Sequence, residues 1–414
     1  MPSRAGRTKL LFLCQTLPFP PDGGVNIRAY HILRLLAAEF DVVALCFFRR
    51  AVRRSAREVA ASIDGLRQFG PVEAFPIPQE HSRLRWFGDH ARSLVAGRAY
   101  TLDAYESAHF RSRVREVLAG GTFGLVHADS IDLAGYFAEF AGVPWVLTHH
   151  NVESQLLSRR AERESSLARR WYVHRQAVLT DRLEREWCRR APLNVAVSDA
   201  DAAALRAAAP GAEVMVVPNG VDVDTFRPGG ADGRGVVFVG GTTWFPNRDA
   251  LEYFSAAILP LVPAEKRPPI TWVGRCTDEE RARYAGLGVT LTGYVDDIRP
   301  FVHQAACFVV PLRVGGGTRL KILDAWAMGK AVVSTSVGCE GLEAVDGENI
   351  IIRDDPRDFA QAVSAVLADG SLRSRLERNA RATAERRYSW KVIGEPMIRR
   401  YRALAGLVPE GGTR

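Results

Sequence analysis

The 414-residue chain is poor in lysine and has no long hydrophobic run. Arginine supplies 50 of its 55 basic side chains and lysine only five. No window approaches the roughly 18 consecutive apolar residues of a membrane-spanning helix, and the start of the sequence shows no signal-peptide pattern. We therefore expect a cytoplasmic protein that does not cross a membrane.

Cysteine is also scarce, and several common motifs are missing. The six cysteines show no C-x-x-C spacing, and several lie in apolar strand-like runs. We predict that they are small core residues in a reducing compartment. The sequence has no P-loop G-K-S/T and no early G-x-G-x-x-G, which argues against a mononucleotide kinase and a nicotinamide-dependent dehydrogenase.

The charge is unevenly distributed along the chain. The formal net charge is +8, with 29 basic against 23 acidic side chains in residues 1–217 and 26 against 24 in residues 218–414. Arginines gather at 49–57 and 159–170. A solvated helix face explains such groups, and attraction to an anionic membrane surface is the alternative. Aromatic residues are not interleaved with the arginines, which argues against nucleic acid as a partner.

Short apolar runs alternate with charged or amphipathic stretches throughout the chain. In the first half these runs are residues 10–15, 41–48, 123–129, 144–150, 193–198 and 213–218; in the second half they are 236–240, 270–274, 289–293, 307–312, 331–335 and 349–354. Continuous apolar strands, each followed by a helix, are typical of parallel sheets covered on both faces. The sequence thus predicts an α/β protein with two Rossmann-like, doubly wound domains.

A segment rich in Gly, Pro and Asp separates the two sets of strands. PNGVDVDTFRPGGADGRG (218–235) has no periodic apolar pattern, so we expect a linker over 216–235. The two domains then span 1–215 and 236–387. Because open α/β sheets bind ligands at the carboxyl ends of their strands, we expect the domains to face each other across a cleft that holds the site.

The strongest functional signal is PLRVGGGTRLKILDAWAMGKAVVST (311–335), which combines an apolar strand, three glycines, two cations and a helix. Glycines 315–317 would let a ligand approach backbone amides at the helix start. Arg319 can donate two hydrogen bonds to phosphate, and Lys321 adds a compact charge. Asp324, further along the helix, can accept from ribose hydroxyls. The stretch predicts a phosphate site; a surface glycine loop with solvated cations is the alternative.

Two loops of the first half also follow strands. Gly23 and Gly24 open a helix where backbone amides can approach an anion. In THHN (148–151), adjacent histidines of one strand point to opposite faces, so we expect a single imidazole, His150, at the site and no metal. VDVD (221–224) matches the D-x-D of metal-dependent sugar transferases, but it lies in the linker, and we assign it no metal.

These motifs resemble the GT-B glycosyltransferases, specifically family 4 and its relatives that build bacterial polysaccharides. The resemblance covers nearly the whole chain and rests on the Gly-Gly loop, THHN, VSDADAAAL (197–205), VVPNGVDVDTF (216–226), TGYVDD (292–297), residues 315–335 and YSW (388–390). It implies transfer of a sugar from a nucleotide diphosphate donor, with retention of anomeric configuration and with neither a cofactor nor a bound metal. It also implies that the last helix, within 388–414, returns to the N-terminal domain.

One hallmark of the family is broken in this sequence. The family has two glutamates separated by seven residues. The second contacts the donor ribose and falls on Asp324, a shorter carboxylate with the same chemistry. The first contacts the transferred sugar and falls on Gly316. The donor site implied by the resemblance therefore lacks one carboxylate.

The family's phosphate-binding cations are also replaced. The Arg and Lys that follow the first strand of the C-terminal domain fall on Gly241 and Asn247. Arg319 and Lys321 supply two cations from the neighbouring loop. We expect these two side chains, helped by Arg248, to neutralise the donor diphosphate.

The remaining site positions come from the same motifs. On the donor side they are Gly24, Tyr294, Val295, Gly316, Gly317 and Thr318, and on the acceptor side they are Gly23 and Asn151. Asn151 stands where the family commonly has Asp. His150 matches the family's histidine, whose imidazole contacts the sugar near the reacting centre.

The resemblance implies a glycosyltransferase whose catalytic residues are His150, Arg319 and Lys321. The expected partners are a nucleotide diphosphate sugar, a glycan, polyprenyl-linked or small-molecule acceptor and, through the arginine groups, an anionic membrane surface. Two alternatives stay open. A nucleotide-sugar 2-epimerase shares the architecture but needs a set of carboxylates and histidines that the sequence does not identify. A degenerate homologue, which Gly316 favours, would bind a sugar nucleotide without turnover.

Overall fold

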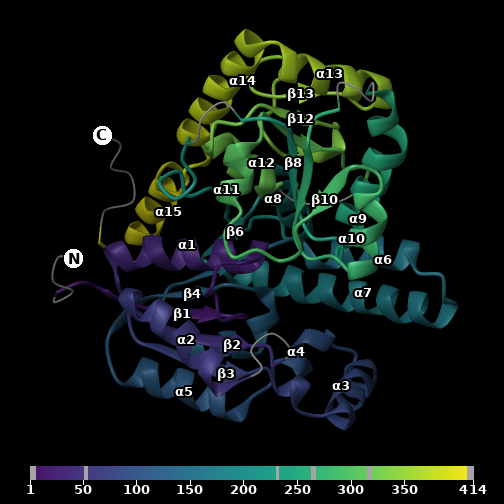
Figure 1. The fold of residues 1–414 in the computed structure, drawn as a ribbon. Helices are drawn as coiled ribbons and strands as arrows, with labels where there is room; N and C mark the ends of the chain where they lie inside the picture. The colour runs from purple at the N-terminus through teal and green to yellow at the C-terminus, as the bar shows by residue number, and fades with distance from the viewer. Residues whose placement is uncertain (1–5, 51–54, 230–232, 263–266, 315–318, 408–414) are drawn as a thin grey trace. The chain divides into compact units, whose positions relative to one another are not determined.

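The computed structural model describes residues 6–50, 55–229, 233–262, 267–314 and 319–407. The chain divides into two compact units, each built on a parallel sheet with helices on both faces (Figure 1). The first unit comprises Met1–Pro218 and Gly394–Arg414, and the second comprises Asn219–Ile393.

The first unit contains a seven-stranded sheet in the order β3-β2-β1-β4-β5-β6-β7, and all neighbouring strands are parallel. Its strands are β1 (Lys9–Cys14), β2 (Asp41–Phe48), β3 (Val72–Pro76), β4 (Phe123–Ala128), β5 (Trp145–Thr148), β6 (Leu193–Ala196) and β7 (Val214–Val216). The central strands β1 and β4 are almost wholly buried, as expected for a sheet with helices on both faces.

Eight helices follow the strands of this unit within the described residues: α1 (Gly24–Glu39), α2 (Ala56–Leu66), α3 (Arg83–Ala96), α4 (Tyr100–Ala104), α5 (Ala108–Ala119), α6 (Glu153–Arg163), α7 (Leu167–Arg190) and α8 (Asp199–Ala208). A ten-residue 3-10 segment, η3 (Ile131–Phe140), joins β4 to β5. The last helix, α15 (Trp390–Leu404), contains the boundary between the units. None of the helices in the described ranges is both long enough and apolar enough to cross a bilayer.

The second unit contains a six-stranded parallel sheet in the order β10-β9-β8-β11-β12-β13. Its strands are β8 (Val236–Val239), β9 (Ile270–Val273), β10 (Val289–Leu291), β11 (Cys307–Val310), β12 (Val332–Ser334) and β13 (Ile351–Ile352). Its helices are α9 (Phe245–Tyr253), α10 (Asp278–Ala285), α11 (Arg299–Gln304), α12 (Leu320–Ala327), α13 (Pro356–Ala368) and α14 (Gly370–Thr383). Trp272 and Trp326 are fully buried in its core.

The structure confirms the predicted α/β class and the two doubly wound sheets. Each predicted apolar run contains a strand. The one strand in the described residues that the sequence does not predict is β3, whose residues VEAFP include a charge and a proline. β3 lies at the edge of the sheet, where a residue without an N–H is tolerated because one side of the strand has no strand partner. Only Phe75 of this strand is buried, so its apolar pattern is weak.

The cysteines lie mainly in the core. All six are free, and all except the partly buried Cys276 are buried. Their prediction as small core residues is confirmed for five of the six. Burial raises the pKa of Cys188 and of Cys307 to about 12, so these two thiols stay protonated at neutral pH.

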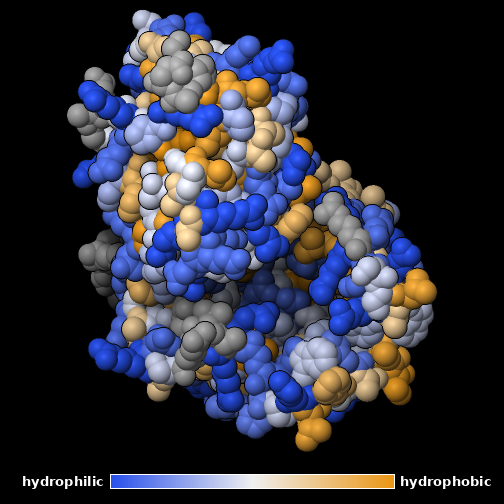
Figure 2. Space-filling view, turned by 45° about the vertical axis from the view of Figure 1, so that its right-hand side comes forward, coloured by the Kyte–Doolittle hydropathy of each residue, from blue (hydrophilic) through white to orange (hydrophobic). Residues whose placement is uncertain are grey.

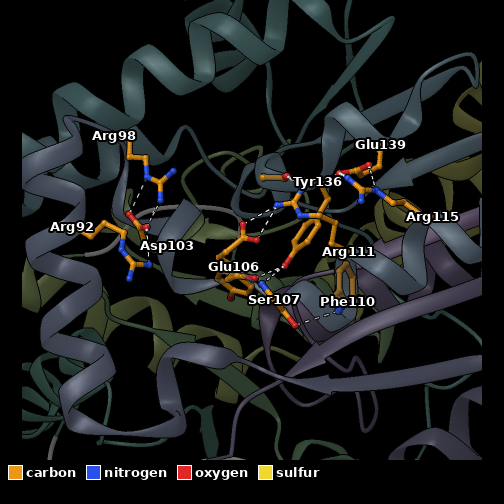
Figure 3. A network of polar contacts seen from close by, with 12 residues as sticks. Arg92, Arg98, Asp103, Glu106, Ser107, Phe110, Arg111, Arg115, Tyr136 and Glu139 are labelled. Atoms are coloured by element: carbon orange, nitrogen blue, oxygen red, sulfur yellow. Dashed lines mark hydrogen bonds and ion pairs between the residues drawn. The ribbon is translucent and has the colours of Figure 1, made fainter.

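A network of arginine–carboxylate pairs links α3 to α4 and α5 to η3 (Figure 3). Arg98 binds Asp103 through two guanidinium nitrogens. Arg111 joins Glu106 and Glu139, with contacts of 2.8 Å to each. The hydroxyl of Tyr136 accepts from the backbone N–H of Ser107 over 3.0 Å. These bonds provide partners for polar groups in and around the loops between short helices. Hydrophobic packing alone would leave those groups without hydrogen-bond partners.

Candidate functional site

A tight backbone turn follows β8 in the second unit. Gly240 has φ +151°, a conformation that favours glycine, and a Cβ there would lie 2.5 Å from Asn247 Nδ2 and 2.8 Å from Lys321 Nζ. Gly241 is restricted as well, because a Cβ would lie 2.9 Å from the backbone N and O of Arg275. Bare backbone at these two positions lets α9, α12 and the end of β9 approach one another.

Lys321, in the first turn of α12, points to this glycine turn. Its Nζ donates to Oδ1 of Asn247 over 2.7 Å and lies 4.0 Å from the ring centroid of Phe238. Asn247 is buried and donates from Nδ2 to the carbonyl of Gly241 over 3.0 Å, so both ends of its amide are used. Burial, followed by the charge of Arg319, lowers the pKa of Lys321 to about 7. The ammonium is therefore held in place without a countercharge.

Arg319, which precedes α12, is directed to a different segment. Its side chain is buried, and Nε and Nη2 donate to the carbonyl of Val337 over 3.3 and 3.2 Å. Nη2 also lies 3.8 Å from Oε2 of Glu340. Burial lowers the pKa of the Arg319 guanidinium. The two predicted cations thus influence each other, but Lys321 contacts the glycine turn and Arg319 contacts η7 (Val337–Cys339).

Asp324 lies one turn after Lys321 on α12. Its residue is partly exposed, and burial of the carboxyl raises its pKa to about 7. Among the described residues none hydrogen-bonds to this carboxyl, so its oxygens can accept from the hydroxyls of a ligand. Three predicted donor residues of the preceding loop, Gly316, Gly317 and Thr318, lie outside the described residues.

The other predicted donor residues lie at the carboxyl ends of neighbouring strands. Arg248 is exposed on α9, with its guanidinium 6.0 Å from the ring centroid of Phe245. Tyr294 follows β10 and is 60% exposed, while Val295 packs against the core. The guanidinium of Arg275, after β9, lies 4.7 Å from the Tyr294 ring centroid. The sequence does not predict Arg275; its place directly after an apolar strand is the one available signal.

In the first unit a buried carboxylate joins the ends of two strands. Asp129 directly follows β4; its Oδ2 lies 3.1 Å from Nε2 of His150, and its Oδ1 lies 3.5 Å from Nε2 of His127. The thiol of Cys14 donates to Oδ2 over 3.2 Å. Burial opposes ionisation, but the two histidines outweigh it and hold the pKa of Asp129 below its usual value. The sequence does not predict Asp129, which stays ionised and orients His150.

Two helices bring further polar groups to this carboxylate. Arg28 of α1 is buried, and its Nη1 donates to the carbonyl of Pro218 over 3.3 Å. Burial lowers the pKa of Arg28 to about 10, and the charge of Asp129 limits the shift. The hydroxyl of Tyr401, on α15, lies 3.0 Å from Nδ1 of His127. His150 therefore lies at one end of a buried network of contacts that includes residues of β1, β4 and α15, and the charge of Arg28 on α1 interacts with its carboxylate.

The adjacent histidines, which directly follow β5, contact different neighbours. His149 is buried, with Nε2 3.1 Å from Oδ1 of Asn194, whereas His150 contacts Asp129. Burial lowers the pKa of His149 to about 4, so this ring is neutral at physiological pH. Asn151 donates to Oε1 of Glu153 over 3.3 Å.

The D-x-D sequence of the linker forms a local turn. Oδ1 of Asp222 accepts from the backbone N–H groups of Asp224 and Thr225 over 3.2 and 3.1 Å, as in an Asx turn. Over the residues that the structure describes, no group of three or more His, Cys, Asp or Glu is placed to hold a metal ion.

A cavity of about 350 Å³ lies at the start of α1. Its walls include Gly23, Gly24 and Asn26 from the helix start, Arg49 from the end of β2, and Tyr105. No atom lies within 4 Å of a Cβ built on Gly23. The Gly-Gly loop thus faces open space that a ligand can occupy.

Two family models match the chain in succession. A model described as Glycosyltransferase Family 4 matches residues 22–225, and one described as Glycosyl transferases group 1 matches residues 233–369. Together they account for most of both units.

Similar proteins of known sequence include two mannosyltransferases. The phosphatidyl-myo-inositol mannosyltransferase of Mycolicibacterium smegmatis is 28% identical over 209 residues, which cover 47% of this chain and 53% of that protein. The chain thus matches about half the length of this relative. The phosphatidyl-myo-inositol mannosyltransferase of Mycobacterium leprae is 26% identical over 310 residues, which cover 71% of this chain and 77% of that protein.

The fold is found in solved structures. Anabaena Alr3699/HepE, solved in complex with UDP, superimposes with a TM-score of 0.67 at 16% identity, over 96% of this chain and 100% of that one. Its likeness concerns the fold, and the two family models supply the sequence relationship. By these matches and by its two parallel Rossmann-like sheets, the chain belongs to the family 4-like glycosyltransferases of the GT-B fold.

Proposed function

We propose that the chain transfers a sugar from a nucleoside diphosphate donor to an acceptor hydroxyl, with retention of configuration and without a bound metal. The observation that carries the proposal is the position of Lys321 at the glycine turn after β8. A cation beside bare backbone suits a phosphate group. The similar HepE structure holds UDP, and the two mycobacterial relatives are named mannosyltransferases, which supports a nucleotide sugar as donor.

The residues of the second unit would divide the donor between them. Lys321 neutralises the diphosphate, with Arg319 and the exposed Arg248 adding positive charge nearby. Asp324 accepts from the ribose hydroxyls. The paired Arg275 and Tyr294 offer a flat face on which a nucleobase can stack.

The reaction then depends on charge at the departing diphosphate. The bond between the anomeric carbon and the diphosphate oxygen breaks, and the acceptor oxygen bonds to that carbon on the same face. The acceptor proton passes to the departing phosphate oxygen, so no protein base is needed. Preorganised donors aimed at the developing negative charge are each worth about 10²–10³ in rate.

His150 and Asp129 would act on the sugar side. Asp129 accepts from Nε2 of His150, which leaves Nδ1 free to accept from a sugar hydroxyl. The carboxylate has no path of its own to the sugar because it is fully buried. We therefore assign His150 to sugar contact and Asp129 to positioning of the imidazole.

We also propose that the first unit associates peripherally with an anionic membrane surface. Exposed arginines on α6 and α7, among them Arg160, Arg169 and Arg170, lie in the same segment as Leu167 and Trp171, which are 77% and 62% exposed. Cations next to exposed apolar side chains suit a surface of anionic lipids. The two mycobacterial relatives are named for a lipid, phosphatidyl-myo-inositol.

A panel of nucleotide diphosphate sugars tests the reaction and its donor cation together. The wild-type protein should release nucleoside diphosphate from one of these donors when acceptor is present. Lys321→Ala should lower turnover by about 10²-fold or more, whereas Lys391→Ala, an exposed lysine of α15, should leave it unchanged. Donor binding without release would identify a degenerate homologue, and conversion of the donor to its 2-epimer would identify an epimerase.

Binding of UDP should depend on pH through Lys321. Because the free ammonium has a pKa of about 7, UDP binding above that pH requires proton uptake, and the dissociation constant should rise by up to about tenfold per pH unit between pH 7 and 9. Lys321→Arg, which stays charged, should remove this rise. Asp324→Asn, which removes the other group titrating near 7, should retain it. Isothermal titration in buffers of different ionisation enthalpy measures both effects; an unchanged slope in Lys321→Arg would assign the proton elsewhere.

Asp129→Asn tests the positioning role. Loss of the charge that orients His150 should lower kcat by up to about 10²-fold, with little change in the KM for the donor. The double variant Asp129→Asn/His150→Gln should be no slower than His150→Gln, because both changes remove one interaction. Cys14→Ala, which removes another contact to the same carboxylate, is the matched control. Additive losses in the double variant would show that Asp129 acts through folding instead.

Sedimentation with lipid vesicles tests the membrane proposal. The protein should pellet with anionic vesicles at low salt and remain in solution with neutral vesicles or at high salt, because each surface cation contributes about 1 kcal/mol and is screened by salt. Arg169→Glu/Arg170→Glu should abolish pelleting. Arg375→Glu/Arg378→Glu, which makes the same change at exposed positions of α14, should leave pelleting unchanged. Equal recovery in solution under all conditions would exclude the association.

A further inference from the structure

The first unit contains a second, larger cavity that the proposed reaction does not use. Its volume is about 1010 Å³, at the upper end of the range for small-molecule sites. Helices α3, α4, α6 and α7 supply most of its walls. The apolar part of these walls is formed by Trp86, Leu94, Ala104, Leu157, Ala168 and Val173, and the walls also carry the charged side chains of Arg49, Asp132, Glu153, Arg160, Glu164 and Arg169.

One wall of this cavity is a rigid aromatic cluster. The rings of His90 and Tyr100 stack in parallel with centroids 4.0 Å apart, and Trp86 meets His90 edge-on at 4.1 Å. Nδ1 of His90 is hydrogen-bonded to the hydroxyl of Tyr172. Its Nε2 is buried without a hydrogen-bond partner among the described residues. The hydroxyl of Tyr100 is also buried without a partner among the described residues, so the wall combines an aromatic surface with two unsatisfied polar atoms.

The larger cavity adjoins the cavity at the start of α1. Arg49 and Tyr105 contribute to the walls of both. A ligand that occupies both cavities would pass Arg49 and Tyr105 on its way to the Gly23–Gly24 loop. The smaller cavity is bordered by polar groups such as Thr16 and Asn26.

The helices that form the larger cavity carry many exposed hydrophobic side chains. Seven of the sixteen exposed large hydrophobic residues of the described chain lie between residues 84 and 171: Leu84, Trp86, Phe87, Val95, Leu156, Leu167 and Trp171. All seven belong to α3, α6 or α7. Figure 2 shows hydrophobic side chains projecting among hydrophilic ones at the lower right of the molecule. Exposed hydrophobic side chains thus lie next to the exposed arginines of α6 and α7 on the helices that form the cavity.

We propose that the cavity between α3, α4, α6 and α7 binds the acyl or prenyl chain of a lipid-linked acceptor. The head group of that acceptor then lies at the Gly23–Gly24 loop, where the sugar would be received. This assignment rests on the proposed transfer reaction and names the class of its acceptor. A chain of methylene or isoprene units matches the apolar walls, and the shared residues Arg49 and Tyr105 mark the transition to the polar head.

Alkyl glucosides of increasing chain length, used below micelle formation, test the chain site by isothermal titration. Affinity should be about tenfold higher for decyl than for octyl glucoside, because two more methylenes are buried. Glucose alone, which has no chain, should bind more weakly than either. Ala91→Trp, on the wall of the cavity, should remove the dependence on chain length. Ala96→Trp, on the same helix but not on the wall, should keep it.

UDP titration and the melting temperature show whether each variant is folded and keeps its donor site. Binding that is independent of chain length, or equal behaviour of Ala91→Trp and Ala96→Trp, would overturn the assignment. A chain-length dependence that Ala91→Trp removes would support it even if no donor in the sugar panel were turned over. Failure of the proposed reaction and failure of the chain site are therefore distinguishable.

Discussion

A negative charge buried at the carboxyl edge of the first sheet determines how the polar groups around it are arranged. Burying an ionised carboxylate is costly unless hydrogen bonds and opposite charges compensate it. Asp129 obtains this compensation from His127, His150 and Cys14, which come from β4, the loop after β5, and β1. The strand order, with β4 between β1 and β5, brings these side chains together at one point. The imidazole of His150 is consequently held at the strand ends, where ligands of this fold class bind.

The second unit holds the opposite charge, the ammonium of Lys321, without a carboxylate partner among the described residues. A carboxylate next to Lys321 would form an ion pair and compete with a phosphate for the ammonium. Asn247 instead offers a neutral oxygen at 2.7 Å, and the face of Phe238 adds a weak attraction. The lowered pKa of Lys321 follows from this choice, because burial without a countercharge disfavours the ammonium. Binding of an anion next to Lys321 would favour the ammonium and raise this pKa again.

The insertion of α3 and α4 between β3 and β4 has a different basis. Its short helices bury few side chains of their own, and α3 buries only Asp89 and Ser93. Arginine–carboxylate pairs centred on Asp103 and Arg111 stabilise the connections. The apolar side chains of α3 contribute little to the buried core. They line a cavity or face solvent, which is unusual for residues such as Phe87 and Leu84.

Alternation of apolar strands and helices was sufficient to predict both parallel sheets, because burial on two faces requires continuous hydrophobic runs. β3 was not predicted, since an edge strand is only partly buried and needs no continuous hydrophobic run. Glycines and charges at strand ends likewise indicated the loops of Gly23, His150 and Lys321. The periodic pattern indicates whether each residue is buried or exposed, however, and does not identify the residues that it contacts.

Only the tertiary structure decides which side chains contact each other. Asp129 and His150 are 21 residues apart, and Lys321 and Asn247 are 74 apart, so no local spacing connects them. β4 and β5 become neighbours through the strand order, and α9 meets α12 because Gly240 and Gly241 leave room. The apolar cavity has the same origin. Four helices separated in the chain enclose it, and a hydrophobic side chain looks the same in sequence whether it faces a core or a cavity.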